Sequence, residues 1–232
     1  MKRHNIHIHT TYSDGSFSAE KLVNMAKNEK LEVIGITDHA FTTKIKSLNE
    51  VTLPGYINDL KLLKEKNSGS GIELKIGLEI DTCYNQGIDP CNVPFDLINK
   101  LDYVLFEYIR VDKGLKKVYR NIESVVNAKK DIKIPVGLAH TDISMALPDN
   151  KDYIKLLGDN DIFVEINLSE NSNYHFLFNK DVIDLIKKYN IKMTIGTDFH
   201  SDIIPAYCLS KNISLAMNFI EDKGLKIHEI AS

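Results

Sequence analysis

Segments with the pattern of β-strands alternate with segments of helical pattern along most of the chain. A first strand is expected from Ile6, and further strands over residues 31–37, 72–80, 102–107, 134–139, 162–167 and 191–197. Helices are expected over residues 19–30, 52–66, 94–99, 115–131, 148–158 and 181–189, with one or two closing helices over 205–224. Strands that alternate with helices pair in parallel, because each helix returns the chain to the same end of the sheet. The pattern therefore predicts an α/β fold.

Histidines and carboxylates fall where the predicted strands end. Seven such residues lie at or just after a carboxyl end: His9, His39, Glu79, Glu107, His140, Asp198 and His200. In a closed α/β barrel these ends form one face, and barrel enzymes have their sites there. An open doubly wound sheet would spread the same residues along a crevice. Their distribution favours a barrel of seven parallel strands with surrounding helices.

The opening strand carries a His-Ile-His triplet followed by a tight turn. Successive side chains of a strand point to opposite faces, so His7 and His9 are expected on one face and Ile6 and Ile8 on the other. The polar turn at residues 13–15 brings the carboxylate of Asp14 within one loop of the imidazoles. A His-x-His triplet alone is also common in polar edge strands.

Four stretches resemble the motifs of the PHP superfamily, the metal-dependent phosphoesterases named after polymerase and histidinol phosphatase. In chain order they are His7-Ile8-His9 with Tyr12-Ser13-Asp14-Gly15, Ile36-Thr37-Asp38-His39, Gly77-Leu78-Glu79-Ile80 and Gly196-Thr197-Asp198-Phe199-His200. The resemblance implies a distorted TIM-like barrel of seven parallel strands. It also implies one PHP domain over residues 1–232. Some PHP nucleases and nucleotide phosphatases insert a helical subdomain between the third and fourth strands, but here only residues 81–101 separate them.

The resemblance further implies two or three divalent metal ions, which would be zinc, manganese or iron. The first ion would be held by His7, His9, Glu79 and Asp198, the second by Glu79 and His140, and the third by Asp14, His39 and His200. The second site departs from the family, which commonly has a histidine near the end of the fourth strand where this chain has Ile109. Glu107, two residues earlier on the same strand face, can supply a carboxylate instead, and a salt bridge from Glu107 to a nearby lysine is the alternative.

Imidazole and carboxylate groups together suit these ions, and closely spaced ions polarise a phosphoryl group and activate water. The expected catalytic residues are Asp198, His200 and Glu79. Arg110, with Lys113, is expected to bind the substrate phosphate, because a guanidinium group binds phosphate in a bidentate manner; a solvated loop cation is the alternative. His175, after the sixth strand, is a further candidate for substrate binding. Asp38 and Glu165 are expected either to orient ligating imidazoles or to form ion pairs.

Composition limits the classes of partner. A net charge of -3 disfavours nucleic acid as the main partner. The three cysteines show no Cys-x-x-Cys spacing, which favours a reducing compartment, and no apolar run approaches the ~20 residues that a bilayer requires. We therefore expect a cytoplasmic protein, without membrane contact, that acts on a small phosphorylated substrate. The alternatives are a nuclease or phosphodiesterase, and a non-catalytic RNA-binding scaffold similar to the barrel subunit of archaeal RNase P. The oligomeric state stays open.

Overall fold

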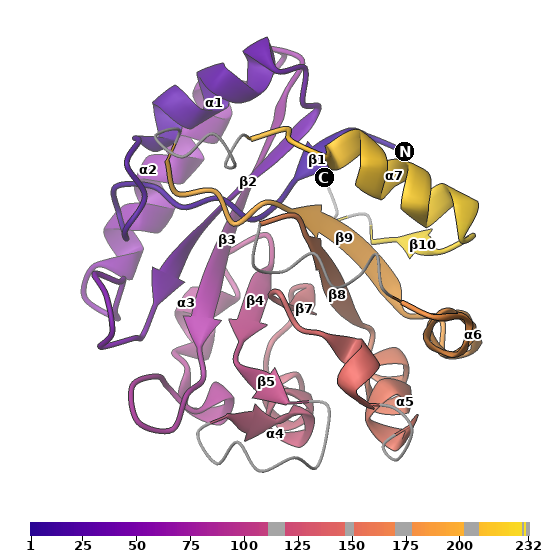
Figure 1. Cartoon of the computed structure of the whole chain (residues 1–232). Coiled ribbons are helices and arrows are strands. Elements are labelled where there is room, and N and C mark those ends of the chain that lie inside the picture. The colour runs from indigo at the N-terminus through magenta and orange to yellow at the C-terminus, as the bar shows by residue number, and fades with distance from the viewer. Residues whose placement is uncertain (111–118, 147–150, 170–177, 202–208, 229, 231–232) are drawn as a thin grey trace.

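A curled parallel sheet with helices outside it forms the body of the protein (Figure 1). The computed structural model describes residues 1–110, 119–146, 151–169, 178–201, 209–228 and 230. The sheet has eight strands in the order β1-β2-β3-β4-β7-β8-β9-β10, and all the neighbouring strands are parallel. The predicted fold class, a distorted barrel of parallel strands, is confirmed.

Most strand bounds agree closely with those expected, but the first strand, expected from Ile6, is found at His4–Asn5. The main sheet consists of β1 (His4–Asn5), β2 (Val33–Ala40), β3 (Glu73–Asp81), β4 (Val104–Glu107), β7 (Val136–Leu138), β8 (Ile162–Asn167), β9 (Lys192–Gly196) and β10 (Lys226–Ile227). Two further strands, β5 (Ile109–Arg110) and β6 (Arg120–Asn121), pair with each other. The pattern predicts seven strands, and the additional one is β10, whose two residues are too few to give a pattern in the sequence.

Helices follow most of the strands, as the pattern predicts. They are α1 (Ala19–Asn28), α2 (Leu53–Lys66), α3 (Phe95–Ile98), α4 (Ile122–Ala128), α5 (Lys151–Asp159), α6 (Lys180–Lys188) and α7 (Ile213–Asp222), with short 3-10 helices η1 (Pro90–Asn92) and η2 (Ile143–Ala146). The helix expected over 115–131 is shorter than predicted at both described ends, because residues 120–121 form β6 and α4 ends at Ala128; residues 115–118 lie outside the described residues. The closing helical region is described from residue 209 onward and contains α7.

The residues after β1 join the two sides of the curled sheet. The backbone N–H of Ile6 donates to the carbonyl oxygen of Ile195 at 3.0 Å, and the N–H of His9 donates to that of Phe199 at 2.9 Å. On the other side the N–H of Thr37 donates to the carbonyl of Ile8 at 2.8 Å. The chain is therefore extended here, as predicted, although only β1 itself makes a regular ladder.

Tyr103 explains why the ladder is interrupted at Ile6. The hydroxyl groups of Tyr103 and Thr37 each lie 2.6 Å from the carbonyl oxygen of Ile6. This oxygen therefore accepts hydrogen bonds from two side chains and not from the backbone N–H group of a neighbouring strand. Ile6 packs inside the barrel with Tyr103 and Phe163, whereas Ile8 packs in the layer between sheet and helices. The expectation that Ile6 and Ile8 share one face is therefore wrong.

The two faces of β3 show how the barrel is built. Every second side chain of β3 points outward and packs against the helices; these residues are Leu74, Ile76, Leu78 and Ile80. The intervening residues face the interior, which contains a small apolar cluster of Ile6, Tyr103, Leu105, Ala139 and Phe163. Gly77 gives Tyr103 its space, because a Cβ atom there would lie 2.4 Å from Cζ of the Tyr103 ring. This cluster fills the middle of the barrel and supports the residues at its carboxyl end.

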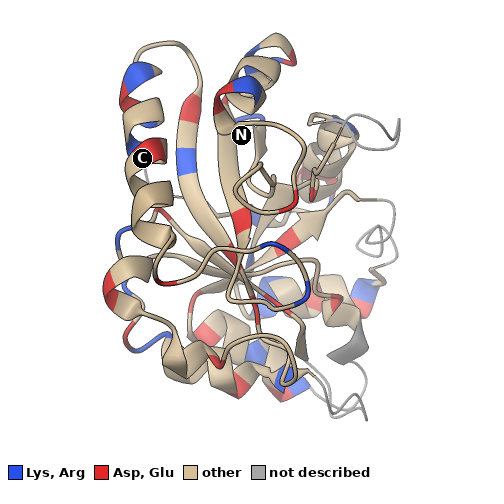
Figure 2. Cartoon of the chain, turned by 90° about the vertical axis from the view of Figure 1, so that its left-hand side faces the viewer, with Lys and Arg blue, Asp and Glu red and all other residues tan. Residues whose placement is uncertain are grey.

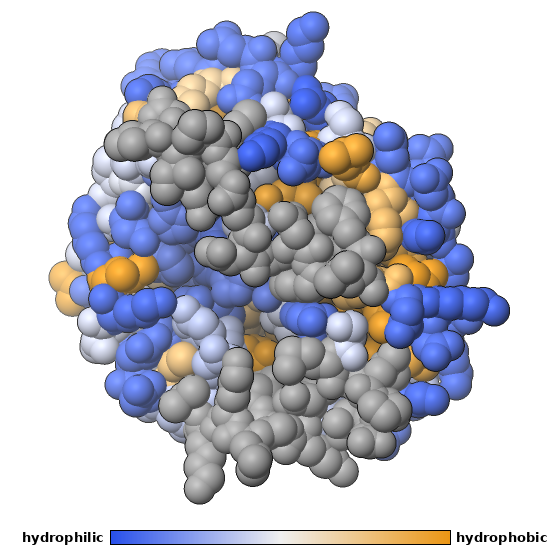
Figure 3. Space-filling view, in the orientation of Figure 1, coloured by the Kyte–Doolittle hydropathy of each residue, from blue (hydrophilic) through white to orange (hydrophobic). Residues whose placement is uncertain are grey.

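The described surface is mixed in character. Lys and Arg alternate with Asp and Glu on the helices that face the viewer in Figure 2. Hydrophobic residues in Figure 3 form small areas among hydrophilic ones. Among the helices that the structure describes, none has both the length and the apolar character needed to cross a membrane.

Gly77 and Gly55 offer a matched test of this packing. Gly77→Ala should lower the free energy of unfolding by about 1–3 kcal/mol or more, because the added methyl group overlaps the Tyr103 ring. Gly55 lies in α2, and apart from neighbouring residues and backbone of its own helix no atom lies within 4 Å of the position that an added methyl group would take, so Gly55→Ala should raise the free energy of unfolding by about 0.5–1 kcal/mol. Urea unfolding in the presence of a chelator measures both. Equal effects of the two substitutions would show that Tyr103 does not fill the barrel as described.

Candidate metal centre

Nine side chains predicted as metal ligands converge at the carboxyl end of the barrel. They come from the segment after β1, from β2, β3 and β4, and from the loops after β7 and β9: His7, His9, Asp14, His39, Glu79, Glu107, His140, Asp198 and His200. The sheet register contributes to this, since His39 and Glu79 are direct partners on β2 and β3. The prediction that these residues meet at one end of the barrel is supported by their positions.

The tightest group consists of His7, His9, Glu79 and Asp198. The Nε2 atoms of His7 and His9 are 3.1 Å apart, and Asp198 Oδ1 lies 3.0 Å from His9 Nε2. Glu79 Oε2 lies 3.2 Å from His7 Nε2 and 3.5 Å from His9 Nε2. Ligands about 2.1 Å from a tetrahedral ion are roughly 3.4 Å from one another, so these spacings suit one cation.

A second group lies toward the turn after β1. It contains His9, Asp14, His39 and His200. Asp14 Oδ1 lies 3.7 Å from His39 Nε2, and Asp14 Oδ2 lies 3.4 Å from His200 Nε2. His9 presents its Nδ1 atom to this group at 3.9 Å from Asp14, while its Nε2 atom belongs to the first group. One imidazole ring thus lies between the two groups.

The third group contains Glu107, the carboxylate expected as a ligand of the second ion. His39 Nδ1 lies 3.0 Å from Glu79 Oε2 and 3.5 Å from Glu107 Oε1. On the other side, His140 Nε2 lies 2.9 Å from Glu79 Oε1 and 3.8 Å from Glu107 Oε2. Glu107 therefore reaches the same side chains that the sequence assigned to the second ion. Ile109 is buried in the core and packs with apolar residues.

Unsatisfied polar atoms show that this donor set fits a cation. Both oxygens of Glu79 are buried without a hydrogen bond, as are Nδ1 of His9 and Nδ1 of His39, although the nearest nitrogen or oxygen atoms of neighbouring side chains lie 2.9–3.9 Å away. These four atoms therefore lie close to polar atoms of other side chains without forming hydrogen bonds with them. Among the described residues, every ion-pair partner of Asp14, Glu79, Glu107 and Asp198 is a histidine. Glu79 and Glu107 are buried, and buried carboxylates without a lysine or arginine are costly unless a cation neutralises them.

Electrostatic effects within the site oppose one another. Burial lowers the pKa of the imidazoles, but the surrounding carboxylates raise the pKa of His39 and of His140 to about 9. For His9, burial and the nearby His39 lower the pKa to about 3. Burial and the charge of Glu79 raise the pKa of Glu107. Without ions, protons on His39 and His140 therefore compensate the carboxylates at neutral pH, and metal binding must displace them.

Two buried carboxylates hold the site without belonging to the three groups. Glu165 on β8 accepts a hydrogen bond from Nδ1 of His7 at 2.8 Å and another from the backbone N–H of His140 at 2.7 Å. It orients one imidazole, as expected, and also fixes the backbone of another. Asp38 instead accepts four hydrogen bonds from the backbone and hydroxyl groups of Thr10 and Ser13. It therefore shapes the turn that carries Asp14.

A cleft of about 200 Å³ opens beside the three groups. Besides six of the predicted ligands, it is lined by Thr42, Lys44, Ile45, Asp81 and Tyr108. Lys44 donates a hydrogen bond from Nζ to the hydroxyl oxygen of Tyr108 at 3.0 Å. Sequence reasoning missed both residues, although each lies in a segment just after the carboxyl end of a strand. Histidines and carboxylates were sought at or just after the carboxyl ends of the predicted strands. The same search for lysine and arginine would have found Lys44.

The three predicted substrate-binding residues are not described at the level of side chains. Arg110 lies on β5, and its side chain is outside the described part of the structure. Lys113 and His175 lie outside the described residues. Their roles stay predictions.

The fold and the convergent donors define a barrel protein with a candidate site for several divalent ions. This chain belongs to the PHP domain family, whose model matches residues 5–169. The match includes His7, Glu79 and His140, whereas Asp198 and His200 lie beyond its end. A relative from Methanocaldococcus jannaschii, an uncharacterized protein, is 28% identical over 203 residues, which cover 86% of this chain and 82% of the relative.

Solved structures share the fold. The histidinol phosphate phosphatase of Lactococcus lactis, in complex with zinc, L-histidinol and phosphate, has a TM-score of 0.64 and 21% identity, covering 97% of this chain and 95% of its own. A putative histidinol phosphatase of Listeria monocytogenes has a TM-score of 0.57 and 16% identity over 88% of this chain and 100% of its own. The metal-dependent tyrosine phosphatases of Bacillus subtilis and Streptococcus pneumoniae give a TM-score of 0.52 with 15% identity, covering 93% of this chain and 86% of the matched chain.

Glu165 provides a test of the site that does not depend on activity. Glu165→Gln should weaken divalent metal binding about 10–100-fold, because an amide presents only one acceptor where the N–H groups of His7 and His140 require two. Competition with a chelator of known affinity measures the change. Glu221→Gln, on the exposed surface of α7, is the matched control and should bind metal as the unmodified protein does. Equal metal affinity in both variants would contradict the positioning role of Glu165.

Proposed function

We propose that this protein is a metal-dependent phosphoesterase that hydrolyses a phosphomonoester at a site for two or three divalent ions. The observation that carries the proposal is Glu79, a fully buried carboxylate with both oxygens unsatisfied and with His7, His39 and His140 around it. Similarity of fold to phosphatases that act on histidinol phosphate and on phosphotyrosine supports the reaction class. Zinc in the first of these supports the kind of cofactor.

Each group of side chains has a separate role in this proposal. His7, His9, Glu79 and Asp198 would hold one ion, and Asp14, His39 and His200 another. Glu79 and Glu107 of the third group, together with the adjacent His140, would hold a third ion. When bound, such ions supply Lewis-acid polarisation of the phosphoryl group and activation of water. Glu79 belongs to two of these groups and fixes their spacing. The Glu107 carboxylate makes the third group harder in character than imidazole would, which favours manganese or iron(II) there over zinc.

Lys44 and Tyr108 provide contacts for the substrate. Burial and the charge of Glu107 raise the pKa of the Tyr108 hydroxyl, so it keeps its proton at neutral pH. The hydroxyl oxygen of Tyr108 accepts a hydrogen bond from Lys44, so the O–H group of Tyr108 is left to donate a hydrogen bond into the cleft. A phosphate oxygen would accept from that hydroxyl group and from the Lys44 ammonium. The cleft volume of about 200 Å³ among the described residues supports a small substrate.

The deciding experiment is a phosphatase panel run with zinc, manganese and iron(II) in turn. Histidinol phosphate, phosphotyrosine, nucleotides, sugar phosphates and short oligonucleotides are the substrates. Asp198→Asn should lower phosphate release at least 100-fold, because it removes a charged group from the tightest set of donors. Asp222→Asn, at the exposed end of α7, is the control and should retain full activity.

The panel also separates the alternatives. Cleavage of oligonucleotides without release of inorganic phosphate would identify a nuclease, and tight RNA binding without hydrolysis would identify a scaffold. Metal content after purification without chelator is measured in the same preparations. A metal-loaded protein that hydrolyses none of the phosphomonoesters would contradict the proposal.

Lys44→Met tests the contact to the substrate. It should raise KM about tenfold for the best substrate of the panel with a smaller effect on kcat, because it removes a charge from the cleft and leaves the metal donors in place. Steady-state kinetics and metal content together measure the effect. Lys61→Met, on the exposed side of α2, should leave both constants unchanged. An unchanged KM in Lys44→Met would exclude Lys44 from phosphate binding.

A further inference from the structure

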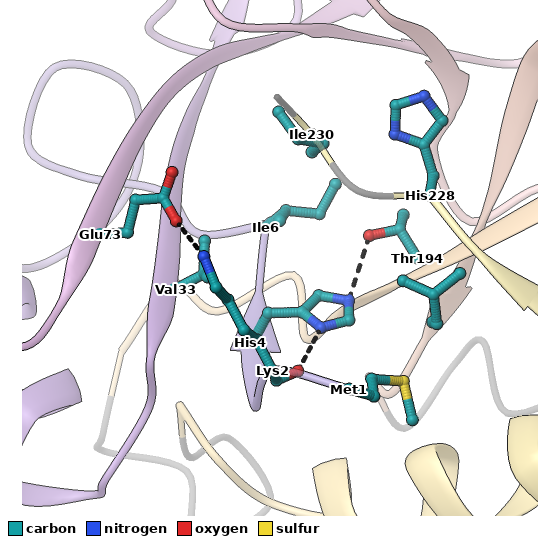
Figure 4. A pocket seen from close by; sticks show the side chains of 10 residues that line it. Met1, Lys2, His4, Ile6, Val33, Glu73, Thr194, His228 and Ile230 are labelled. Atoms are coloured by element: carbon teal, nitrogen blue, oxygen red, sulfur yellow. Dashed lines mark hydrogen bonds and ion pairs between the residues drawn. The ribbon is translucent and has the colours of Figure 1, made fainter. Parts of the chain in front are cut away.

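A second cavity lies at the opposite end of the barrel from the metal centre. It measures about 420 Å³ and shares no lining residue with the cleft beside the metal centre. Its walls include Val33 and Glu73, which are the first residues of β2 and β3, and His4 of β1 (Figure 4). Small-molecule sites in proteins usually have volumes of about 300–1,000 Å³, so this cavity is large enough for a ligand.

Most of the cavity wall is apolar. Ile6, Val33, Ile227 and Ile230 line it. His4 contributes only ring surface, because both of its nitrogens are already used. Nε2 accepts from the backbone N–H of Ile195 at 3.1 Å, and Nδ1 bonds to the carbonyl oxygen of Lys2 at 3.0 Å. A ligand would therefore contact this part of the wall mainly through van der Waals and hydrophobic interactions.

The charged side chains of Lys2 and Glu73 in the wall form an ion pair with each other. Lys2 donates to Glu73 Oε2 at 2.8 Å, on the opposite side of the cavity from His228 in Figure 4. Lys75, which lies behind the wall, contacts Glu73 Oε1. Both oxygens of Glu73 are therefore occupied, and Lys2 already has an anionic partner. A ligand that paired with Lys2 or Glu73 would have to replace one of these contacts, whereas an uncharged ligand would not.

His228 is the polar group of the cavity that lacks a partner. Its ring packs on Phe163 with the centroids 4.6 Å apart, and only 9% of the residue is exposed. Nδ1 of this ring is buried without a hydrogen bond, which costs about 1–3 kcal/mol. Burial also lowers the pKa of His228, so the ring is neutral at physiological pH and has one donor and one acceptor nitrogen. A hydroxyl group can donate or accept, so it satisfies Nδ1 in either tautomer.

We propose that this cavity binds a small uncharged molecule with a mainly apolar body and one hydroxyl group, which forms a hydrogen bond with His228. The apolar body lies against Ile6, Val33 and Ile230, and the hydroxyl group is directed toward Nδ1. The ion pair of Lys2 and Glu73 stays intact at the other side. The site is independent of the metal centre in position and in chemistry.

Two probes that differ by one hydroxyl group test the proposal. Full-length protein, carrying the metal with which it purifies, is titrated with 4-ethylphenol and with ethylbenzene and followed by ¹H–¹⁵N NMR. We expect 4-ethylphenol to bind about tenfold more tightly and to shift the amide signals of residues 227, 228 and 230. His228→Phe should bind both probes with equal affinity, whereas His228→Gln should keep part of the preference because an amide also forms hydrogen bonds.

Ile230→Trp is the second variant, since the larger side chain fills the cavity and should abolish binding of both probes. Metal content and the thermal unfolding midpoint are measured for every variant, so a folding defect is recognised separately. Failure of both probes to bind the unmodified protein would overturn the proposal. Shifts confined to the signals of His39, Glu79 and Asp198 would also overturn it, since they would place the phenol at the metal centre.

Discussion

The buried carboxylate of Glu79 is the constraint on which the rest of the structure depends. It lies on β3, fully shielded from water, with imidazole nitrogens within 3.2 Å on three sides and no hydrogen bond to either oxygen. A charge in such a position is costly unless a cation shares it. Protons on His39 and His140 meet this need in the metal-free protein, and divalent ions meet it better because they draw several donors together at once.

Precise placement of these donors requires a rigid support. Tyr103 provides it directly, since its ring fills the barrel above the Gly77 backbone and its hydroxyl group bonds to Ile6, one residue before His7. Glu165 provides it from the opposite side by holding His7 and the backbone of His140 together. The apolar cluster of Ile6, Tyr103, Leu105, Ala139 and Phe163 separates the candidate metal centre at one end of the barrel from the mainly apolar cavity at the other.

The fold could be predicted from the sequence because it depends on local periodicity, and the same periodicity placed most of the candidate donors at the ends of strands. His39, Glu79 and Asp198 could be placed at strand ends from their own segments alone. The role of Tyr103 could not be predicted, since it depends on a contact between residues 103 and 6 that no periodicity records. Strand β10 was missed for a similar reason, because two residues acquire their structure from pairing with β9 and not from their own pattern. Lys44 was missed because cations were sought only after the fourth strand.

Backbone conformation completes the arrangement of the donors. Tyr108, His140 and Asp198 each follow a strand of the barrel and have positive φ angles of 58°, 29° and 52°. Residues other than glycine adopt this region at a cost of about 1–3 kcal/mol each, and such residues cluster at functional sites. The turn after each strand redirects the chain across the barrel end, which brings His140 and Asp198 toward Glu79. Glycine would remove the strain but also the ligand, so the strained backbone and the metal donors have to be supplied by the same residues.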